Sequence, residues 1–416
     1  MIHLSRLLSV LFLSASFFAY GANNLTSYDW NDCRGSAKPY PAPATVTNTP
    51  DSLTAVMINH VGRHGARYPS SSKNSMHLAE LLEKASKLHT ITPRGKRLMA
   101  LNEKIIDAST GRWGVLDTLG KAEQQGIAMR TYGQFIRLFR DGRINAVSSY
   151  VPRCIMSMYE FTHQIARLDN RVEILTSSGR QNNELMRFFS INEPYKAFAE
   201  SEEVTDAIDA YADSVMPRTV LRKLLGTSFP YEEIDEREAL MAVYSVIAGT
   251  AAMEMPEKPS DFLTLEEFNA LWSVFNLKQY LTHSGNSLSM LPARIARPLL
   301  MDLIATTDSM VAGADIAPVQ LRFGHAETLM PLLSLIQLPG CSYYSDNLES
   351  VATNWLDFNI VPMASNFRLV LFKTKKGAYY VRADFNEIPV ALIPSRPDDI
   401  YIPWEEAREY LLFRAG

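Results

Sequence analysis

The stretch TAVMINHVGRHGARYP, residues 54–69, decides the fold assignment. Its first part is mostly apolar and rich in branched side chains, which predicts a short buried strand over residues 54–60. Gly62, Gly65 and Pro69 follow and predict a tight loop at the carboxyl end of that strand. Ligands of α/β proteins bind at this end of the sheet. The stretch therefore predicts an α/β fold with a functional site beside its first strand.

The loop has the composition of a phosphate-binding site. Arg63 and Arg67 flank a single imidazole, that of His64. Guanidinium groups are planar, bidentate donors that stay charged at any working pH, and a phosphate dianion requires several such donors. The pattern Arg-His-Gly-x-Arg-x-Pro arises by chance about once in ten thousand sequences of this length, which disfavours an ordinary basic surface loop. The residues therefore predict a phosphate site with a nucleophile inside it.

A metal site is the rival interpretation of the same segment, because His60 and His64 are four residues apart. On a helix that spacing would point both imidazoles the same way, but Gly62 and Gly65 break any helix here. The chain contains no HExxH, CxxC or Cys–His cluster. We expect no metal site, and we expect His60 to be a strand residue packed near the loop.

Two later segments carry further candidate residues. His325 follows a predicted strand, and Glu327, two residues on, is placed to protonate a departing alkoxide. Arg153 follows another predicted strand in the segment Ser-Ser-Tyr-Val-Pro-Arg-Cys, residues 148–154. Each segment alone is unremarkable: a glutamate in a first helical turn is expected from the helix dipole. They gain meaning only together with the first motif.

Strands and helices alternate at both ends of the chain around a helical middle. We predict strands over residues 146–150, 172–176, 319–323, 367–372 and 379–382, helices over 74–89 and 118–140, and a mostly helical region over about 193–312. This pattern favours an α/β core with a central, mostly parallel sheet flanked by helices and interrupted by a mainly helical cap. The expected division is core over residues 23–155, cap over 156–312 and core again over 313–416.

The N-terminus resembles a secretory signal, with a short apolar run over residues 7–19 after Arg6 and small residues at 21 and 22. We expect cleavage after residue 22, an exported protein in the periplasm or medium, and no stable membrane anchor. The formal net charge of −4 argues against a nucleic-acid-binding surface. Cys33, Cys154 and Cys341 allow at most one internal disulfide, and the sequence does not choose among the pairings.

The three motifs together resemble the histidine phosphatases of the acid phosphatase and phytase branch. The matching segments are RHGARYP from Arg63, Ser149 with Arg153, and FGHAETLMPLLSL from Phe323. The resemblance is strongest to the multiple inositol polyphosphate phosphatases, because that subgroup carries His-Ala-Glu where most of the branch carries His-Asp. It extends over roughly residues 50–395.

The resemblance implies hydrolysis of phosphomonoesters of inositol polyphosphates such as phytate, through a phosphohistidine on His64. It implies that Glu327 protonates the leaving oxygen, and it assigns no metal or other cofactor and no obligate protein partner. The implied partner is therefore a small polyanion. The residues implied to hold the transferred phosphoryl group are Arg63, Arg67, Arg153 and His325, and the candidates for binding other phosphates are Lys73, Arg180, Arg187 and Lys278.

Two alternatives remain open from the sequence. A broad-specificity acid phosphatase acting on sugar phosphates or phosphoglycerate would use the same fold and the same motifs. A non-catalytic phosphate- or phytate-binding protein is disfavoured because a binder requires neither His64 nor Glu327.

Overall fold

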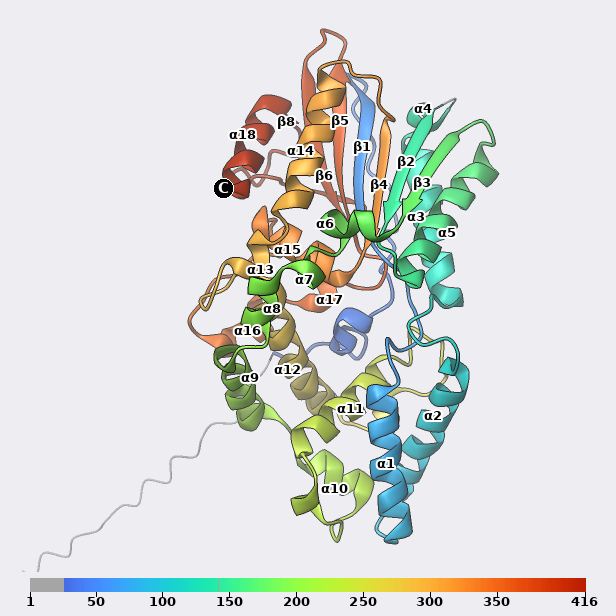
Figure 1. The fold of residues 1–416 in the computed structure, drawn as a ribbon, viewed down its shortest axis with the longest axis vertical. Helices are drawn as coiled ribbons and strands as arrows, with labels where there is room; N and C mark the ends of the chain where they lie inside the picture. The colour runs from blue at the N-terminus through green and yellow to red at the C-terminus, as the bar shows by residue number, and fades with distance from the viewer. Residues whose placement is uncertain (1–25, 141) are drawn as a thin grey trace, which may run out of the picture.

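The computed structural model describes residues 26–140 and 142–416, so the expected signal segment, residues 1–22, lies outside the described residues. One half of the molecule is a sheet covered by helices, and the other half is helical (Figure 1). Of the described residues, none belongs to a helix long and apolar enough to cross a membrane.

The sheet is mixed and has eight strands in the order β3-β2-β4-β1-β5-β6-β7, with β8 paired to β6. β1, β2, β3 and β4 run parallel, whereas β5 is antiparallel to β1 and β6 is antiparallel to β5. This confirms the predicted mostly parallel α/β sheet. The strands are β1 Leu53–Arg63, β2 Arg143–Ser148, β3 Glu173–Ser178, β4 Val319–Gly324, β5 Asn366–Thr374, β6 Tyr379–Phe385, β7 Ile388–Val390 and β8 Ile402–Pro403.

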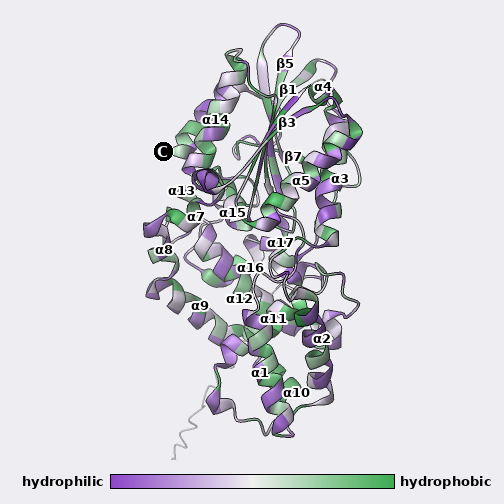
Figure 2. Cartoon of the chain, turned by 45° about the vertical axis from the view of Figure 1, so that its right-hand side comes forward, coloured by the Kyte–Doolittle hydropathy of each residue, from purple (hydrophilic) through white to green (hydrophobic). Residues whose placement is uncertain are grey.

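Helices cover both faces of the sheet because β1 is apolar on both sides. Met57 and Val61 pack into one core cluster, and Ile58 points to the opposite one. α3 (Thr118–Gln134) and α5 (Pro152–Leu168) lie on the Ile58 face, and the other face holds α14 (Arg297–Val311), α15 (Ala326–Leu335) and α18 (Trp404–Ala415). Figure 2 shows hydrophobic (green) and hydrophilic (purple) residues alternating along helices beside the sheet such as α3, α5 and α14.

The helical half has its own core, which includes Leu82, Leu101, Leu224, Leu240 and Trp272. Its longer helices are α1 Lys73–Lys87, α2 Pro93–Ser109, α9 Glu202–Val215, α10 Thr219–Leu225, α11 Glu236–Ala248 and α12 Leu265–His283. A short N-terminal 3-10 segment, η1 (Asp32–Ala37), packs against α11 and α12. The remaining short helices are α4 Ile136–Phe139, α6 Asn183–Met186, α7 Phe188–Ile191, α8 Glu193–Ala199, α13 Leu291–Arg294, α16 Val351–Asn354 and α17 Asp357–Ile360.

The observed packing differs from the expected division at residue 156. α5 and β3 fall in the range expected to form the cap, yet they pack with the sheet, and α14 packs against β1. Conversely, α1 packs against α11 and α2 against α10, so these early helices join the helical half. The physical reason is that each helix packs where its apolar face can be buried. α5, for example, buries Met158, Phe161 and Ile165 against the sheet.

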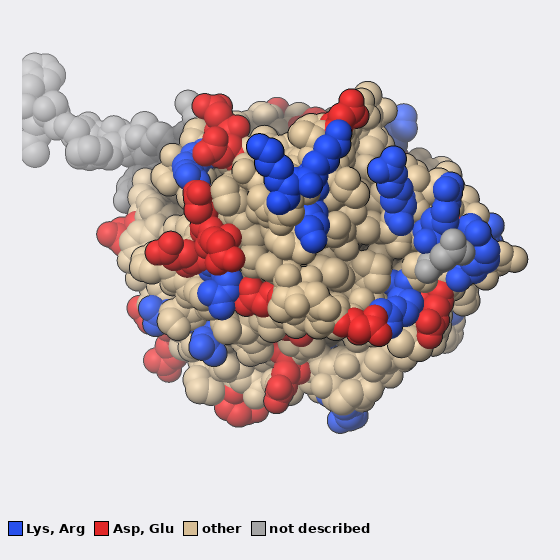
Figure 3. Space-filling model, turned by 90° about the horizontal axis from the view of Figure 1, so that it is seen from above, with Lys and Arg blue, Asp and Glu red and all other residues tan. Residues whose placement is uncertain are grey.

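Several element boundaries also differ. The helix expected over residues 118–140 breaks after Gln134, because Phe135 leaves helical geometry and turns its ring into the core. Neither α2 nor α18 was predicted from the sequence. β7 and β8, which are very short strands, were also not predicted. The three cysteines, all within the described chain, are buried and free, so no disulfide joins them. The end of the molecule that belongs to the sheet half carries both positively and negatively charged side chains (Figure 3).

Candidate active site

Three parallel strands end side by side at one edge of the sheet. β4 lies between β2 and β1, and the register pairs Arg63 with Gly324 and Ser148 with Phe323. Two hydrogen bonds continue this register past the strands: His64 N–H donates to Gly324 O, and Ser149 N–H donates to Phe323 O, each at 3.0 Å. Parallel pairing therefore joins segments that are far apart in sequence.

The motif loop is held by its backbone. Gly65 N–H donates to Ser157 Oγ at 3.1 Å, and Ala66 N–H donates to Glu123 Oε2 at 2.7 Å. The loop also lies directly on α3: a Cβ added to Gly120 would be 2.1 Å from Ala66 O, closer than any side chain can approach. These contacts fix the direction in which the arginines on either side of His64 leave the backbone.

His64 is buried, with 2% of its surface exposed. Its Nδ1 lies 2.9 Å from the carbonyl oxygen of Gly65. A carbonyl only accepts, so Nδ1 carries the proton and Nε2 is left with a free lone pair. Burial, together with the charges of Arg153 and Arg63, lowers the pKa of His64 well below its ordinary value. The site therefore holds a neutral imidazole in the nucleophilic tautomer.

The charges of three guanidinium groups, those of Arg63, Arg67 and Arg153, each act on this ring. Arg63 is 3% exposed and donates through Nη1 to the carbonyls of Ser36, at 2.6 Å, and Val361. Burial lowers the pKa of Arg63 to about 10 and that of Arg67 to about 9, so both stay protonated at neutral pH. Arg153 leaves the first turn of α5.

His325 completes the group from the end of β4. Its ring centroid is 5.8 Å from that of His64. Arg153 Nη2 donates to its Nδ1 at 3.3 Å, and its Nε2 lies 3.0 Å from Ser149 Oγ. The sequence expectation that Arg153 and His325 reach the same place as His64 agrees with this geometry.

Glu327 stands in the first turn of α15, half-buried. Burial raises the pKa of its carboxyl, but His325, His283, a backbone hydrogen bond and Arg63 together outweigh burial and lower the pKa to about 2. Without ligand, the carboxyl is therefore ionised across the physiological range.

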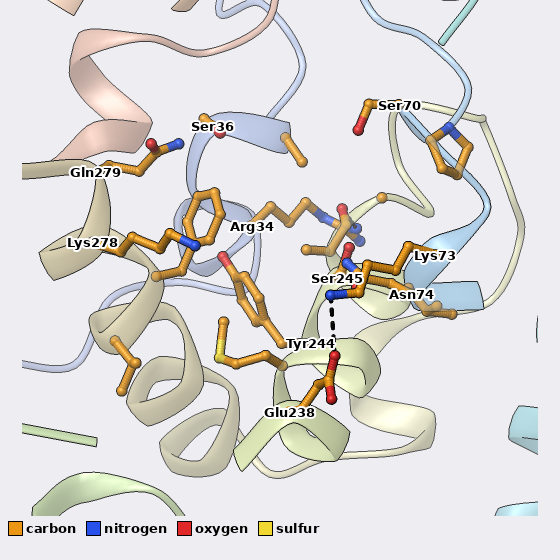
Figure 4. Close-up of a pocket in the computed structure, with 18 of the residues that line it drawn as sticks. Arg34, Ser36, Ser70, Lys73, Asn74, Glu238, Tyr244, Ser245, Lys278 and Gln279 are labelled. Atoms are coloured by element: carbon orange, nitrogen blue, oxygen red, sulfur yellow. Dashed lines mark hydrogen bonds and ion pairs between the residues drawn. The ribbon is translucent and has the colours of Figure 1, made fainter. Parts of the chain in front are cut away.

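A cavity of about 590 Å³ adjoins Arg63 and Arg67, within the ~300–1,000 Å³ range of small-molecule sites. It runs between the motif loop and helices α11 and α12 (Figure 4). Two of the four candidate phosphate-binding residues, Lys73 and Lys278, line it. Both are exposed, and Lys73 Nζ is 3.2 Å from Glu238 Oε1.

The other two candidates are not among the residues that line this cavity. Arg180 and Arg187 both lie over the ring of Tyr150, at 5.1 and 4.9 Å. Arg187 also lies 5.5 Å from the ring of Phe189, which packs edge-on against His325 at 5.6 Å. Arg187 therefore lies next to the side of the site that His325 forms. Arg180, which lies over Tyr150, is farther from His325.

Sequence reasoning missed the residues that support the site from behind. Glu123 and Gln124 of α3 hold Ala66 N–H and Arg63 O, and burial raises the pKa of Glu123 to about 7. Asp357 accepts hydrogen bonds from Ser36 N–H and Trp272 Nε1. No motif surrounds these residues in the sequence, because their roles come from contacts between distant segments.

The donor set favours an anion over a cation. Within residues 26–140 and 142–416, no group of three or more His, Cys, Asp or Glu side chains is arranged to hold a metal ion. A neutral imidazole beside three guanidinium groups is instead suited to attack on phosphorus, since the cations stabilise the charge of the equatorial oxygens. The chemistry that the site supports is phosphoryl transfer.

Comparison with known proteins agrees with this chemistry. A model of the histidine phosphatase superfamily (branch 2) matches residues 56–386. Multiple inositol polyphosphate phosphatase 1 of Homo sapiens is 25% identical over 393 residues, which covers 83% of this chain and 76% of the human protein. The protein of the same name from Gallus gallus is 25% identical over 374 residues, covering 83% and 79%.

Solved structures show the same fold. A multiple inositol polyphosphate phosphatase of Bifidobacterium longum, in complex with inositol hexasulfate, matches with a TM-score of 0.76 and 18% identity over 91% of this chain and 97% of that one. A phytase of D. castellii matches with a TM-score of 0.70 and 17% identity over 94% and 86%. Since the family model spans most of the sequence, including all three strand ends, the chain belongs to the histidine phosphatase superfamily (branch 2) and is a phosphatase.

Proposed function

We propose that the protein hydrolyses phosphomonoesters of inositol polyphosphates, phytate among them, through a phosphohistidine intermediate. The observation that carries the proposal is a buried neutral imidazole, on which the charges of three guanidinium groups act, beside a cavity that holds additional cations. The names of the relatives support the same substrate class, since two are multiple inositol polyphosphate phosphatases and one structure holds inositol hexasulfate.

In the first step, His64 Nε2 attacks phosphorus in line with the ester oxygen. The N–P bond forms as the P–O bond breaks, and Glu327 gives its proton to the departing ring oxygen. Arg63, Arg67 and Arg153 stabilise the three equatorial oxygens. In the second step, water attacks phosphorus and gives a proton to the Glu327 carboxylate, the N–P bond breaks, and inorganic phosphate leaves.

Glu327 becomes protonated when the substrate binds. The carboxyl is ionised in the free protein, as its pKa of about 2 requires. A phosphate group bound between the arginines neutralises part of the positive charge that holds this pKa down, and it adds a like charge nearby. Both effects raise the pKa of Glu327 in the complex, so the carboxyl binds a proton that it then donates.

Further phosphates of the same substrate would bind on two sides. Lys278 and Lys73 line the cavity, and Arg187 and Arg180 stand on the Tyr150 side next to His325. Neither Arg187 nor Arg180 forms an ion pair with a carboxylate of the described residues. Their charges are therefore available to an anion.

Phosphate release from phytate and from a simple sugar phosphate, measured side by side, tests the substrate class. We expect phytate to give the higher kcat/KM. A preference for the sugar phosphate would instead identify a broad-specificity acid phosphatase, and binding of phytate without turnover would identify a non-catalytic binder.

We also infer that the protein is exported, on the basis of the apolar run and small residues within residues 1–22. Sequencing the N-terminus of the protein recovered outside the cytoplasm tests this inference. We expect it to begin at residue 23, and an intact N-terminus in the cytoplasm would contradict export.

A further inference from the structure

The cavity contains four cationic side chains besides those of the motif loop, and two of the four are paired with a carboxylate. Lys73 is paired with Glu238 at 3.2 Å, and Arg237 with Asp209 at 3.0 Å. Arg34 of η1 also lines the cavity, and no carboxylate of the described chain lies within ion-pair distance of it. Its charge is therefore not compensated by an acid.

Arg34 is also deeply buried, with 8% of its surface exposed. Lys278, which likewise lacks an acidic partner in the described part of the chain, is exposed and keeps its hydration. A buried cation without a counter-ion has lost most of its water, and an anion that reaches it regains favourable charge interaction in a region of low dielectric. Burial also lowers the pKa of Arg34, as expected for an uncompensated cation.

The hydrogen bonds of Arg34 engage one end of the guanidinium. Its Nη1 donates to Ile247 O at 3.2 Å, Ala248 O at 3.0 Å and Thr250 Oγ1 at 2.9 Å, which lie at the carboxyl end of α11. Nε and Nη2 have no partner within the described residues. In Figure 4 the side chain crosses the pocket between the Lys278 side and the Lys73 side.

The backbone of η1 connects Arg34 to the catalytic arginines. Arg63 Nη1 donates to the carbonyl of Ser36, two residues after Arg34. Gly35 between them has φ +58° and ψ −138°, a region open to glycine, and a Cβ there would be 2.8 Å from Asp357 Oδ2. This turn presents Ser36 to Arg63 and Arg34 to the cavity.

We propose that Arg34 binds a second phosphate of the substrate, one that remains on the ring while another is transferred at His64. The ligand class is an ester with at least two phosphates on a compact ring, and the inference rests on the proposed function. The α11 carbonyls orient the guanidinium through Nη1, and Nε with Nη2 form the edge that faces the phosphate.

The test is calorimetric titration of the full-length mature protein with inositol hexasulfate and, separately, with inorganic phosphate. In Arg34→Met we expect hexasulfate to bind about tenfold or more weakly than in the wild type, because a buried charge-assisted pair is lost. The affinity for inorganic phosphate should fall by a much smaller factor, since that ion occupies the His64 end.

The matched control is Thr250→Val, which removes one structural partner of Arg34 and keeps the guanidinium. We expect its hexasulfate affinity to stay within about threefold of the wild type. If Thr250→Val weakens hexasulfate binding as much as Arg34→Met does, Arg34 acts only as a cap of α11 and the proposal is overturned. An Arg34→Met protein with wild-type hexasulfate affinity also overturns it.

A second variant covers failure of Arg34→Met to fold. Arg34→Lys keeps the charge but loses the planar edge, and we expect its loss of hexasulfate affinity to exceed its loss of phosphate affinity by at least threefold. Equal losses for both ligands overturn the proposal. A wild-type protein that binds phosphate and does not bind hexasulfate refutes the substrate class itself, which is a different result from failure of Arg34 alone.

Discussion

Among the site residues, Glu327 is the one whose proposed role differs most from its protonation state in the free protein. It is ionised in the free protein, with a pKa of about 2, yet the proposed reaction needs its proton. His325, His283, a backbone hydrogen bond and the charge of Arg63 lower this pKa. In the proposed complex, a phosphate bound between the arginines offsets the charge of Arg63. In the proposed reaction, substrate binding and protonation of Glu327 are therefore linked, and the residue acts as an acid only in the complex.

Replacing Glu327 by Gln tests this assignment, because an amide has the same shape and no acidic proton. We expect kcat for phytate to fall about 10²–10⁴-fold. With p-nitrophenyl phosphate, whose leaving group departs without protonation, the fall should be much smaller. Steady-state kinetics on both esters gives the comparison, and an equal loss on both would refute the role as general acid.

The residues that could be predicted from sequence are those whose chemistry is written in a short motif. Arg63, His64, Arg67 and His325 belong to such motifs, and the structure brings them together with Arg153. Glu123 and Arg34 could not be predicted, because a carboxylate in a helix and an arginine in a loop have no local signal. Their positions depend on contacts across 57 and 213 residues, respectively.

At the level of elements, α3 is the support on which the motif loop rests. It presents Gly120 to the loop backbone, and it carries two further glycines, of which Gly133 lies near its other end. A Cβ at Gly120 would be 2.1 Å from Ala66 O, and one at Gly133 would meet nothing within 4 Å. The two positions therefore form a matched pair.

Gly120→Ala should move the loop and reduce both activity and stability. We expect kcat to fall at least tenfold and the free energy of unfolding to fall by about 1–3 kcal/mol, because the added methyl overlaps backbone atoms. Gly133→Ala should leave kcat unchanged and raise stability by up to about 1 kcal/mol, from helix propensity alone. Equal effects at both sites, by kinetics and thermal melting, would contradict this role of α3.

β1 carries a buried histidine that is separate from the proposed chemistry. The ring of His60 packs between Phe161 and Phe323, and its Nδ1 has no hydrogen-bond partner within the described residues. Burial, with the charges of Arg368 and Arg322, lowers its pKa to about 3. The unfolded chain binds a proton here below about pH 6.5, but the folded chain does not, so stability falls as pH drops from 6.5 towards 3.

His60→Phe removes this titration. Between pH 7.5 and pH 5, we expect the wild type to lose about 2 kcal/mol more of its free energy of unfolding than the variant does. Comparing the pH dependence within each protein cancels any constant packing cost of the larger ring. Denaturant melts at the two pH values measure the difference, and parallel pH dependences would show that His60 is not neutral in the fold.

The main elements were predictable because β1, β4 and β5 are rich in branched and aromatic residues and because helices such as α1 and α5 have clear periodicity. The division of the chain into core and cap was less predictable from the sequence. α5 and β3 return to the sheet, and α1 and α2 join α10 and α11, because an apolar face does not indicate which partner it packs against.

In the molecule as a whole, one edge of the sheet faces the helical half across a charged cavity. The sheet supplies the reacting groups from three adjacent strand ends, and α11, α12 and η1 supply the opposite wall. In the proposed function, this arrangement separates two tasks: the strand ends perform phosphoryl transfer, and the helical wall selects the remainder of the substrate. The proposed substrate preference therefore depends on the helical half, and the reaction type depends on the sheet.

The central claim is that these strand ends form one cationic site around a single attacking imidazole. Rapid acid- and alkali-quenched reaction with ³²P-labelled phytate, followed by peptide mapping, tests it most directly. We expect an acid-labile, alkali-stable phosphoryl group on His64 that is absent from His64→Ala. Label on another residue, or turnover that persists in His64→Ala, would contradict the claim.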